Sequence, residues 1–514
     1  MKKTICSALF LFAGSCDALW GYTKVPTQDN CLAGGLVCQP YEICNANTEQ
    51  CEQQQPQLNA VKPQVIFFDG GDRISINGAG FSPGTQLFID GQLMTSVMIT
   101  SATELSVNIP MKAVSQGWGT KPISVEVRVG DKSATRSDLL SLASNVANFT
   151  PYTVTGIIPK GNIGNIQIGD VDNDGKSDIV ARSAYDPGGG VTPDLEFYTS
   201  IGNGDGTFKK AVKMATQSKS AGHFVLCDLN KDSKLDLAYW SNVEKQFFFS
   251  INPGTGIFPT QTQLFMPPMP PINYYLGVAE LNGDSVNDLV VIDNDNPSMF
   301  TVVSDLAGKL IPPPQITPKT GTTLNARNGV PLLADFNGDK KSDLLTYSTM
   351  FDPAVYLGNG NGTFGNGKSS PGSRAISDIA IADFDNDGYP DFVTTSVTYR
   401  EVGVFRNLKG QDFSWTSLAN KSANAVFLLA TDLNGDKNAD ILVFEASTLN
   451  PSGYAYMGRG DGTFAAQTLS VKTSIPVPGV VVPRVADINS DGKLDMAFTN
   501  YSDQNAYLIL NSLK

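Results

Sequence analysis

A nine-residue acidic motif occurs seven times in the chain. The first copy is DVDNDGKSD from Asp170. Oxygen atoms at positions 1, 3, 5 and 9, with a backbone carbonyl near position 7, can surround one hard cation, and Ca²⁺ accepts six to eight such ligands. An EF-hand opens similarly but closes with Glu at position 12 on a helix, whereas here Asp stands at position 9 and an apolar, strand-sized run follows. The motif therefore predicts calcium in a turn between two strands. The other copies begin at Asp228, Glu280, Asp335, Asp383, Asp432 and Asp487.

The seven predicted calcium sites differ in their ligands. The first and fifth copies carry four aspartates and a glycine at position 6, and the seventh comes next. The second, fourth and sixth have Asn at position 3 and Ser233, Lys340 or Lys437 where glycine would relieve strain, so they should bind more weakly. The third is the least complete, because its first ligand is a glutamate. The predicted ligands are Asp170, Asp172, Asp174, Asp178, Asp228, Asn230, Asp232, Asp236, Glu280, Asn282, Asp284, Asp288, Asp335, Asn337, Asp339, Asp343, Asp383, Asp385, Asp387, Asp391, Asp432, Asn434, Asp436, Asp440, Asp487, Asn489, Asp491 and Asp495.

Composition and charge exclude several functions. The chain has 514 residues, with 37 basic and 50 acidic side chains and a formal net charge of −13. A general nucleic-acid binder needs the opposite sign, and the sequence has no basic run. His223 is the one histidine of the sequence, which excludes histidine-based catalysis and multi-histidine metal sites within one chain. Bound calcium explains most of the acidity without a cationic partner.

The acidic motifs divide the second part of the chain into repeats. Successive motifs begin 58, 52, 55, 48, 49 and 55 residues apart, and each lies between two short apolar runs. A third strand and a glycine-rich turn follow, as in GNGDGTF from Gly202. Four strands in each repeat of about fifty residues predict an all-β fold, a seven-bladed β-propeller with one blade per repeat. The seventh repeat lacks a fourth strand, and we expect Tyr152 to Ile158 to supply it and close the ring.

Two resemblances support this organisation. The acidic motifs with their GxGxGTF turns, from roughly Asn148 to Lys514, resemble the FG-GAP/VCBS repeats of integrin-α-like propellers. That resemblance implies a seven-bladed propeller with calcium in the turn between the first two strands of a blade. Before it, GGDRISINGAGFSPGTQLFIDG lies among closely spaced alternating strands and resembles an IPT/TIG immunoglobulin-like domain. A small β-sandwich is therefore expected at residues 60–146 as a spacer or protein-binding module, and the propeller at 147–514.

The N-terminal segment predicts export. Two lysines, a short apolar run and small residues form a signal peptide over residues 1–15. The residues before Cys16 also resemble a bacterial lipobox, so secretion and lipid anchoring at the cell surface both stay open. Residues 16–59 form a cysteine-rich segment and linker, in which four cysteines predict two disulfides. Their pairing is open, and a zinc site is disfavoured because CxxC spacing is absent. The four cysteines are Cys31, Cys38, Cys44 and Cys51.

The propeller face opposite the calcium turns is the expected ligand surface. Aromatic residues in its turns can stack on sugar rings, or else only cap the blade ends. We therefore expect an exported, calcium-binding, non-catalytic recognition or adhesion protein with a carbohydrate or protein ligand, touching membrane only through a lipid on Cys16. The alternatives are a carbohydrate-active enzyme, a lyase or glycosidase using acidic residues of this face, and a structural surface component. The aromatic residues are Tyr185, Tyr274, Tyr275, Phe351 and Tyr399.

Overall fold

The structure is a computed structural model, and two compact units make up the chain: unit 1 ends at Leu142, and unit 2 contains residues 143–514. The predicted signal peptide, Cys16, Cys31 and Phe351 lie outside the described residues. Every regular element in those residues is a β-strand, and none is a helix of the length and hydropathy needed to cross a membrane. The described residues are 37–67, 72–109, 119–143, 149–154, 162–185, 194–214, 221–241, 244–259, 262–265, 274–293, 298–304, 310–311, 331–347, 352–370, 376–396, 398–418, 425–445, 453–467, 483–500 and 505–511.

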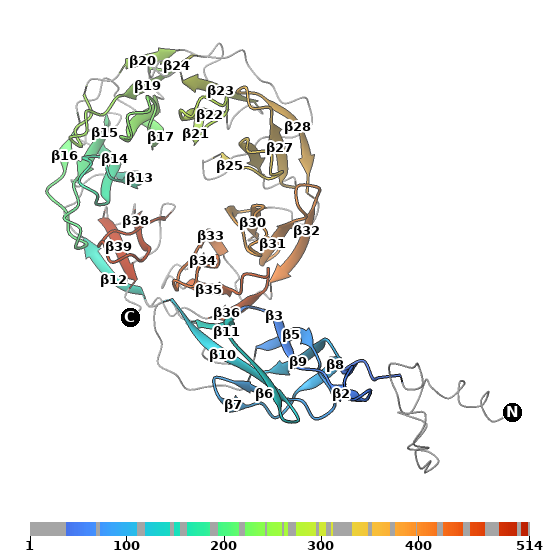
Figure 1. Ribbon diagram of the computed structural model, residues 1–514. Coiled ribbons are helices and arrows are strands. Elements are labelled where there is room, and N and C mark those ends of the chain that lie inside the picture. The colour runs from blue at the N-terminus through green and yellow to red at the C-terminus, as the bar shows by residue number, and fades with distance from the viewer. Residues whose placement is uncertain are drawn as a thin grey trace. The chain divides into compact units, whose positions relative to one another are not determined.

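Unit 1 contains a hairpin and two antiparallel sheets (Figure 1). In β5 the buried Ile74 and Ile76 alternate with more exposed residues, as do Val125 and Val127 in β10. This alternation is that of a sandwich whose sheets each bury one face. The hairpin pairs β1 (Glu42–Cys44) with β2 (Cys51–Gln53); one sheet has the order β3 (Gln57–Lys62), β5 (Arg73–Ala79), β9 (Glu104–Asn108), β8 (Met98–Ser101); the other has β4 (Val65–Phe67), β11 (Lys132–Ala143), β10 (Thr120–Val129), β6 (Gln86–Ile89), β7 (Gln92–Leu93).

The cysteine-rich segment is held by disulfides. Cys38 bonds to Cys51 with an S–S distance of 2.11 Å, which fixes one pairing that the sequence left open. Cys44 is also disulfide-bonded. Cys227 of unit 2 is a free thiol, 3% exposed, in a hydrophobic core. Its role is therefore in packing.

Within the described residues, unit 2 holds seven four-stranded antiparallel sheets, which we call blades 1 to 7. The first strand of each blade lies toward the centre of a ring and the fourth at its rim (Figure 1). Blades 1 to 6 are β13 (Asn162–Gly169), β14 (Asp178–Tyr185), β15 (Asp194–Ser200), β16 (Val212–Lys213); β17 (Ala221–Cys227), β18 (Asp236–Ser241), β19 (Gln246–Ser250), β20 (Thr262–Phe265); β21 (Tyr274–Ala279), β22 (Asp288–Asp293), β23 (Ser298–Ser304), β24 (Leu310–Ile311); β25 (Leu332–Ala334), β26 (Asp343–Thr346), β27 (Ala354–Gly358), β28 (Phe364–Ser369); β29 (Asp378–Ala382), β30 (Asp391–Ser396), β31 (Glu401–Asn407), β32 (Phe413–Leu418); and β33 (Ala425–Thr431), β34 (Asp440–Glu445), β35 (Gly453–Gly458), β36 (Phe464–Gln467).

Blade 7 joins two distant parts of the chain. It contains β37 (Arg484–Ala486), β38 (Asp495–Asn500) and β39 (Asn505–Asn511), and its outer strand is β12 (Phe149–Val154). The pairing of β12 with β39 runs from Phe149 opposite Asn511 to Val154 opposite Ala506. The predicted closure of the ring is confirmed, with the strand starting three residues earlier than expected. Proline is tolerated within β12 because this strand forms the edge of its sheet.

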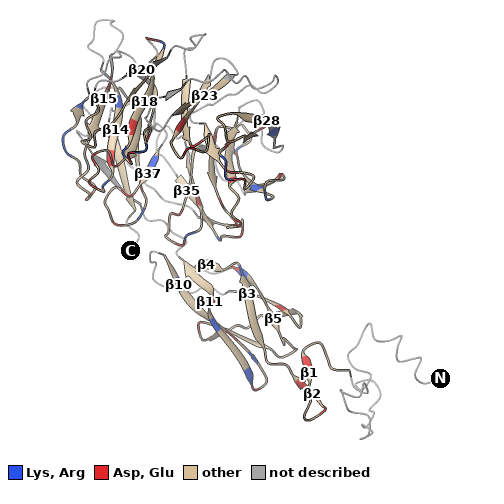
Figure 2. Ribbon diagram, turned by 45° about the horizontal axis from the view of Figure 1, so that its top comes forward, with Lys and Arg blue, Asp and Glu red and all other residues tan. Residues whose placement is uncertain are grey.

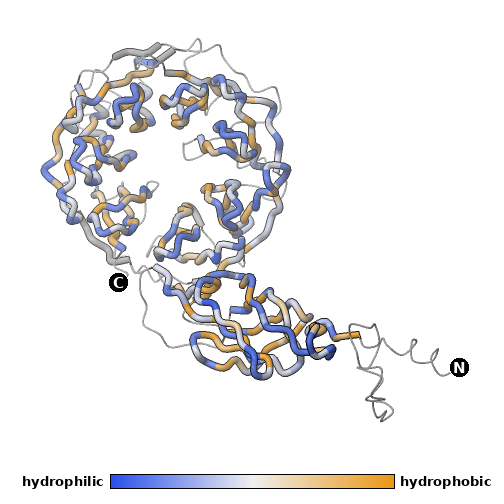
Figure 3. The backbone as a smooth tube through the Cα atoms, viewed as in Figure 1, coloured by the Kyte–Doolittle hydropathy of each residue, from blue (hydrophilic) through white to orange (hydrophobic). Residues whose placement is uncertain are grey.

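Neighbouring blades share apolar cores. All six residues of β18 are buried, and Figure 3 shows apolar and polar residues mixed along the blades. Between blades 2 and 3, the ring of Trp240 lies 4.5 Å from that of Tyr274, and both pack with Phe247. Burial of such aromatic side chains is a large source of stability. These cores fix the first strands in a ring around the centre.

Candidate metal and ligand sites

Each acidic motif forms the turn between the first and second strands of a blade; we number the turns as the blades. Positions 4 and 6 have positive φ, as at Asn386 (55°) and Gly388 (87°) in turn 5. This is the left-handed region, which glycine adopts without strain. The expected strain at position 6 is confirmed for Ser233, Lys340 and Lys437, and the structure adds Ser285 to these strained residues.

The aspartates at position 9 connect the turn to two strands. In turn 5, Asp391 is fully buried, and its Oδ2 accepts a hydrogen bond from Phe384 N–H at 2.9 Å. Its Oδ1 accepts another from Asn407 N–H, at the end of the third strand, at 2.6 Å. Burial raises its pKa to about 7. The sequence predicted a metal ligand here, and the structure adds a backbone-organising role. The fully buried members are Asp178, Asp236, Asp288, Asp343, Asp391, Asp440 and Asp495.

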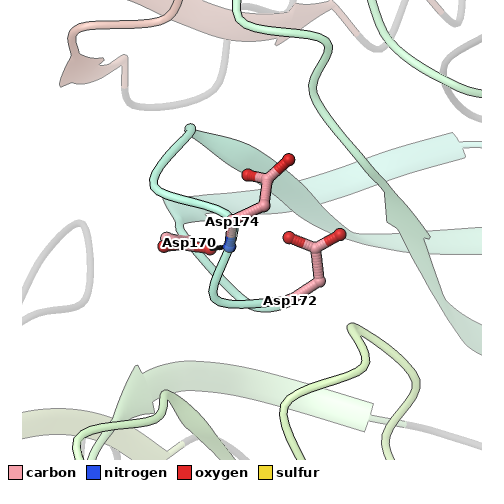
Figure 4. A group of neighbouring side chains, drawn as sticks. All are labelled: Asp170, Asp172 and Asp174. Carbon is pink, nitrogen blue, oxygen red and sulfur yellow. Dashed lines mark hydrogen bonds between the residues drawn. The ribbon is translucent and has the colours of Figure 1, made fainter.

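Two turns bring three acidic ligand atoms within 4.8 Å of one another. In turn 1 these belong to Asp170, Asp172 and Asp174 (Figure 4), and in turn 5 to Asp383, Asp385 and Asp391. The two turns are also the most complete by sequence.

One buried oxygen in each of these clusters has no hydrogen-bond partner: Oδ1 of Asp172 and Oδ1 of Asp385. Burial, together with the neighbouring Asp387 and Asp383, raises the pKa of Asp385, although Arg406 at 3.6 Å opposes this. A buried carboxylate oxygen without a donor is unfavourable unless a cation fills the role. The residues of both turns therefore fit a hard divalent ion.

In the other five turns, the amide at position 3 is satisfied locally. The Asn337 oxygen, for example, accepts the N–H of Asp339 at 2.9 Å. In turns 3 and 6 the amide nitrogen also donates to the position-5 carboxylate, as from Asn282 to Asp284 at 3.0 Å and from Asn434 to Asp436 at 3.2 Å. A lysine at position 7 pairs with position 5 in turns 1, 2, 4 and 7. Turn 5 has Tyr389 there, and its competing cation is instead Arg406, at 3.6 Å from the Oδ2 of Asp385.

The expected aromatic platform is not supported. The prediction for Tyr274 is wrong, because its side chain is 4% exposed and lies in the core between blades 2 and 3. Tyr275 is partly buried and packs edge-on against His223, with ring centroids 5.7 Å apart. Tyr399 is 57% exposed in the turn before β31, in a different blade. For Tyr185 the structure describes only the backbone, in β14.

A cavity of about 530 Å³ lies at the centre of the ring. The first strands of all seven blades line it, from Gln167 of β13 to Arg484 of β37. Most of the lining is apolar, as at Leu226 and Leu429, and its polar side chains include Asp378 and Tyr347. Burial raises the pKa of Asp378 to about 7, although Leu428 N–H donates to its Oδ2 at 2.8 Å. This is the shape and lining expected of a small-ligand pocket.

Sequence reasoning named Tyr275 as a ligand-face residue but overlooked Asp378, Gln167 and Arg484, although the repeat register contains the signal. Counting back from each acidic motif, position −5 is Asn165, His223, Tyr275 and Asp378 in blades 1, 2, 3 and 5, and position −3 is Gln167 in blade 1 and Arg484 in blade 7. Because side chains alternate along a regular strand, such as β29, positions −5 and −3 share one face. In β13 and β17 the register shifts beside Asn165 and His223, so alternation alone does not place these two residues.

Family models match both parts of the chain. The FG-GAP-like repeat matches residues 335–394 and 432–498, and the IPT/TIG domain matches residues 56–144. The chain contains FG-GAP-like repeats and an IPT/TIG domain. The two FG-GAP-like matches cover turns 4 to 7, including the acidic cluster of turn 5. The IPT/TIG match starts before the predicted boundary at residue 60, as does β3.

The solved structures similar to this chain include two proteins named for binding and one named as enzyme-like, each with a TM-score below 0.5. A lectin of Agrocybe aegerita that recognises non-reducing terminal N-acetylglucosamine is 16% identical, with a TM-score of 0.47, over 68% of this chain and 95% of the lectin. An auxiliary nutrient-binding protein of Bacteroides ovatus is 11% identical, with a TM-score of 0.39, over 89% of this chain and 98% of that protein. A quinonprotein alcohol dehydrogenase-like protein of Bacteroides thetaiotaomicron is 11% identical, with a TM-score of 0.38, over 80% of this chain and 96% of that protein. No curated protein sequence matches the chain.

Proposed function

We propose that this chain is an exported, calcium-binding recognition or adhesion protein without catalytic activity, whose propeller holds a carbohydrate or protein ligand. The single observation that carries the calcium assignment is the pair of buried, unpartnered oxygens of Asp172 and Asp385 within the two acidic clusters. A bound calcium ion would supply these two oxygens with the positive partner that the hydrogen bonds of the turns do not provide.

The four aspartates of turn 5 and the four of turn 1 would hold the ion. In both turns, positions 1 and 5 also bind backbone N–H groups of the turn, as Asp383 does with Gly388 at 2.9 Å. The carboxylates are therefore already oriented, which favours binding over chelation by a flexible loop. Such an ion stabilises the turn between two inner strands and takes no part in ligand chemistry. The remaining five turns are expected to bind more weakly.

Recognition is assigned to the centre of the ring. The acidic turns follow the ends of the first strands, so the starts of these strands, with Asp378 and Arg484, face the opposite side. The alternative of a glycosidase requires two carboxyl groups that flank one bond. Among the described residues that line the cavity, Asp378 is the one acidic group. A binding site therefore agrees better with this lining than a hydrolytic one.

The test of calcium binding is a titration of the metal-free full chain by calorimetry, followed by thermal unfolding with calcium and with chelator. We expect binding, and stabilisation of about 2.7 kcal/mol when free calcium is a hundred times its Kd. Asp385→Asn should remove one site, whereas Asp461→Asn, in a glycine-rich turn outside the clusters, should not. An unfolding temperature that calcium leaves unchanged would refute the proposal.

Recognition and export need separate measurements. A glycan array probed with the calcium-loaded chain should show selective binding, and incubation of the bound glycans should release no product. Cleavage of a bound glycan would instead establish the enzyme. Mass spectrometry of the protein made in an exporting host should show loss of residues 1–15, and a lipid on Cys16 if the lipobox is used. Retention of residues 1–15 would contradict export.

A further inference from the structure

The central cavity contains a cation with few partners. Arg484 is the first residue of β37, lines the cavity, and is the basic residue of that strand (blue in Figure 2). A guanidinium group carries five N–H donors. Among the described residues, its hydrogen bonding consists of one long contact, from Nη1 to the carbonyl of Pro483 at 3.4 Å, and it forms no ion pair. Most of its donors therefore remain available to a ligand.

Asp378, the one acidic residue among the described residues of the lining, does not fully balance this charge. Asp378 is 7% exposed, and its Oδ2 is already occupied by Leu428 N–H. Burial lowers the pKa of the Arg484 guanidinium, and the charge of Asp378 opposes this only in part. Arginine nevertheless stays protonated in proteins. Near neutral pH the carboxyl of Asp378 is partly protonated, since its pKa is raised to about 7. The centre of the cavity is then positive, within a chain of net charge −13.

His223 is close enough to Arg484 to be affected by its charge. Burial, and then the charges of Arg484 and Arg182, lower its pKa to about 3. The imidazole is therefore neutral, and its Nδ1 accepts a hydrogen bond from Leu276 N–H at 3.4 Å. Two arginines from different blades thus act on one histidine beside the cavity.

The cavity volume limits the size of the ligand. A volume of about 530 Å³ is within the range of small-molecule sites, roughly 300–1,000 Å³. Its apolar walls, at Val225 and Leu429, suit the faces of a sugar ring. The amide nitrogen of Gln167 already donates to the Phe224 carbonyl at 3.2 Å, and its amide oxygen can accept a hydrogen bond from a hydroxyl. A planar guanidinium binds a carboxylate through two parallel hydrogen bonds.

We infer that the central cavity binds a sugar acid of one or two rings, with the carboxylate of the ligand paired to Arg484. This rests on the proposed recognition function, whose ligand class it narrows, and it does not depend on calcium. The apolar walls favour a sugar ring over an isolated small anion. A carboxylate on a peptide is the competing ligand, and the experiment separates the two.

The experiment is a ligand-observed NMR titration of the calcium-loaded full chain with sodium glucuronate and with glucose, its neutral counterpart. We expect glucuronate to bind at least about tenfold more tightly, because a charge-assisted bidentate contact is lost with glucose. Arg484→Gln should abolish this preference for glucuronate. Arg484→Lys should keep only part of it, because the lysine ammonium cannot form the two parallel hydrogen bonds of a planar guanidinium. Arg400→Gln, an exposed arginine outside the cavity lining, is the matched control and should bind as the wild type.

Three results of the glucuronate titrations would overturn the inference, and a fourth comes from a peptide-like probe. These are equal binding of glucose and glucuronate, unchanged binding by a folded Arg484→Gln variant, and absence of binding to the wild type. N-acetylglutamate amide binding as tightly as glucuronate would refute the sugar assignment in favour of an acidic side chain. The calcium titration runs on the same samples. Calcium binding without glucuronate binding refutes this inference alone, and glucuronate binding without calcium binding refutes the calcium assignment alone.

Discussion

The aspartates at position 9 should hold each blade together without calcium, and Asp343 offers the clearest test. It is fully buried in turn 4, outside the two acidic clusters found among the described residues. Its oxygens accept Phe336 N–H at 2.8 Å and Gly358 N–H at 2.7 Å. Asp343→Ala leaves both donors buried without an acceptor, at about 1–3 kcal/mol each. Burial raises the pKa of this carboxyl, so its removal also relieves desolvation. We therefore expect a net loss of about 2–4 kcal/mol.

Guanidinium unfolding in chelator, followed by tryptophan fluorescence, measures this loss without a contribution from calcium. The matched control is Asp461→Ala. Asp461 also accepts a backbone hydrogen bond, from Thr463 N–H at 3.0 Å, but at an exposed turn where water can replace it. Its removal should change the free energy of unfolding by about 0.5 kcal/mol or less. If Asp343→Ala were no more destabilising than Asp461→Ala, the backbone-organising role would be wrong.

Three further predictions concern charge. Asp385→Asn should lower the unfolding temperature in calcium but change it little in chelator, because the amide removes charge repulsion with Asp383 and Asp387 while it loses the ion pair with Arg406; an equal loss in both conditions, by differential scanning fluorimetry, would contradict this. The pKa of His223 is lowered to about 3. Its contribution to folding stability is therefore fully present above the unfolded pKa of about 6.5, and it is lost as pH falls toward 3, by up to about 1.4 kcal/mol per pH unit. His223→Gln should flatten the acid side of the stability curve, and an unchanged curve counts against burial of the neutral ring. Glucuronate affinity should rise as pH falls from 8 to 6, because Asp378 becomes neutral beside Arg484. Tyr347 and His223 keep the same protonation state over this range. Asp378→Asn should therefore remove the pH dependence of the affinity in the NMR titration.

The strand order of unit 2 could be predicted because one local motif repeats in every blade. Each acidic turn marks the end of a first strand and the start of a second, so the arrangement of the apolar runs follows from it. Ring closure was also predictable, because the last repeat lacks a strand. The dual role of position 9 was not, since it depends on hydrogen bonds to the third strand, as from Asn407 to Asp391. Such contacts have no local sequence signature.

The error at Tyr274 has a simple physical cause. Adjacent residues of a strand point to opposite faces. Tyr275 stands five residues before its acidic motif, in register with His223 and Asp378, whereas Tyr274 is one residue out of that register and enters the core. Aromatic content alone does not distinguish these faces. Counting back from each motif would have identified Asp378, five residues before the motif of blade 5. The same count would have identified Arg484, three residues before the motif of blade 7.

The pairing of β12 with β39 gives unit 2 the topology of a clasped ring. During synthesis, β12 emerges first among the strands of this unit and waits for its partner until the last strand is complete. Until then β12 presents unpaired N–H and C=O groups, which can pair with other chains. The entropy lost on closing a long loop grows only slowly with its length. The ring therefore closes late, and the pairing of β39 with β12 is the step that commits all seven blades to the ring.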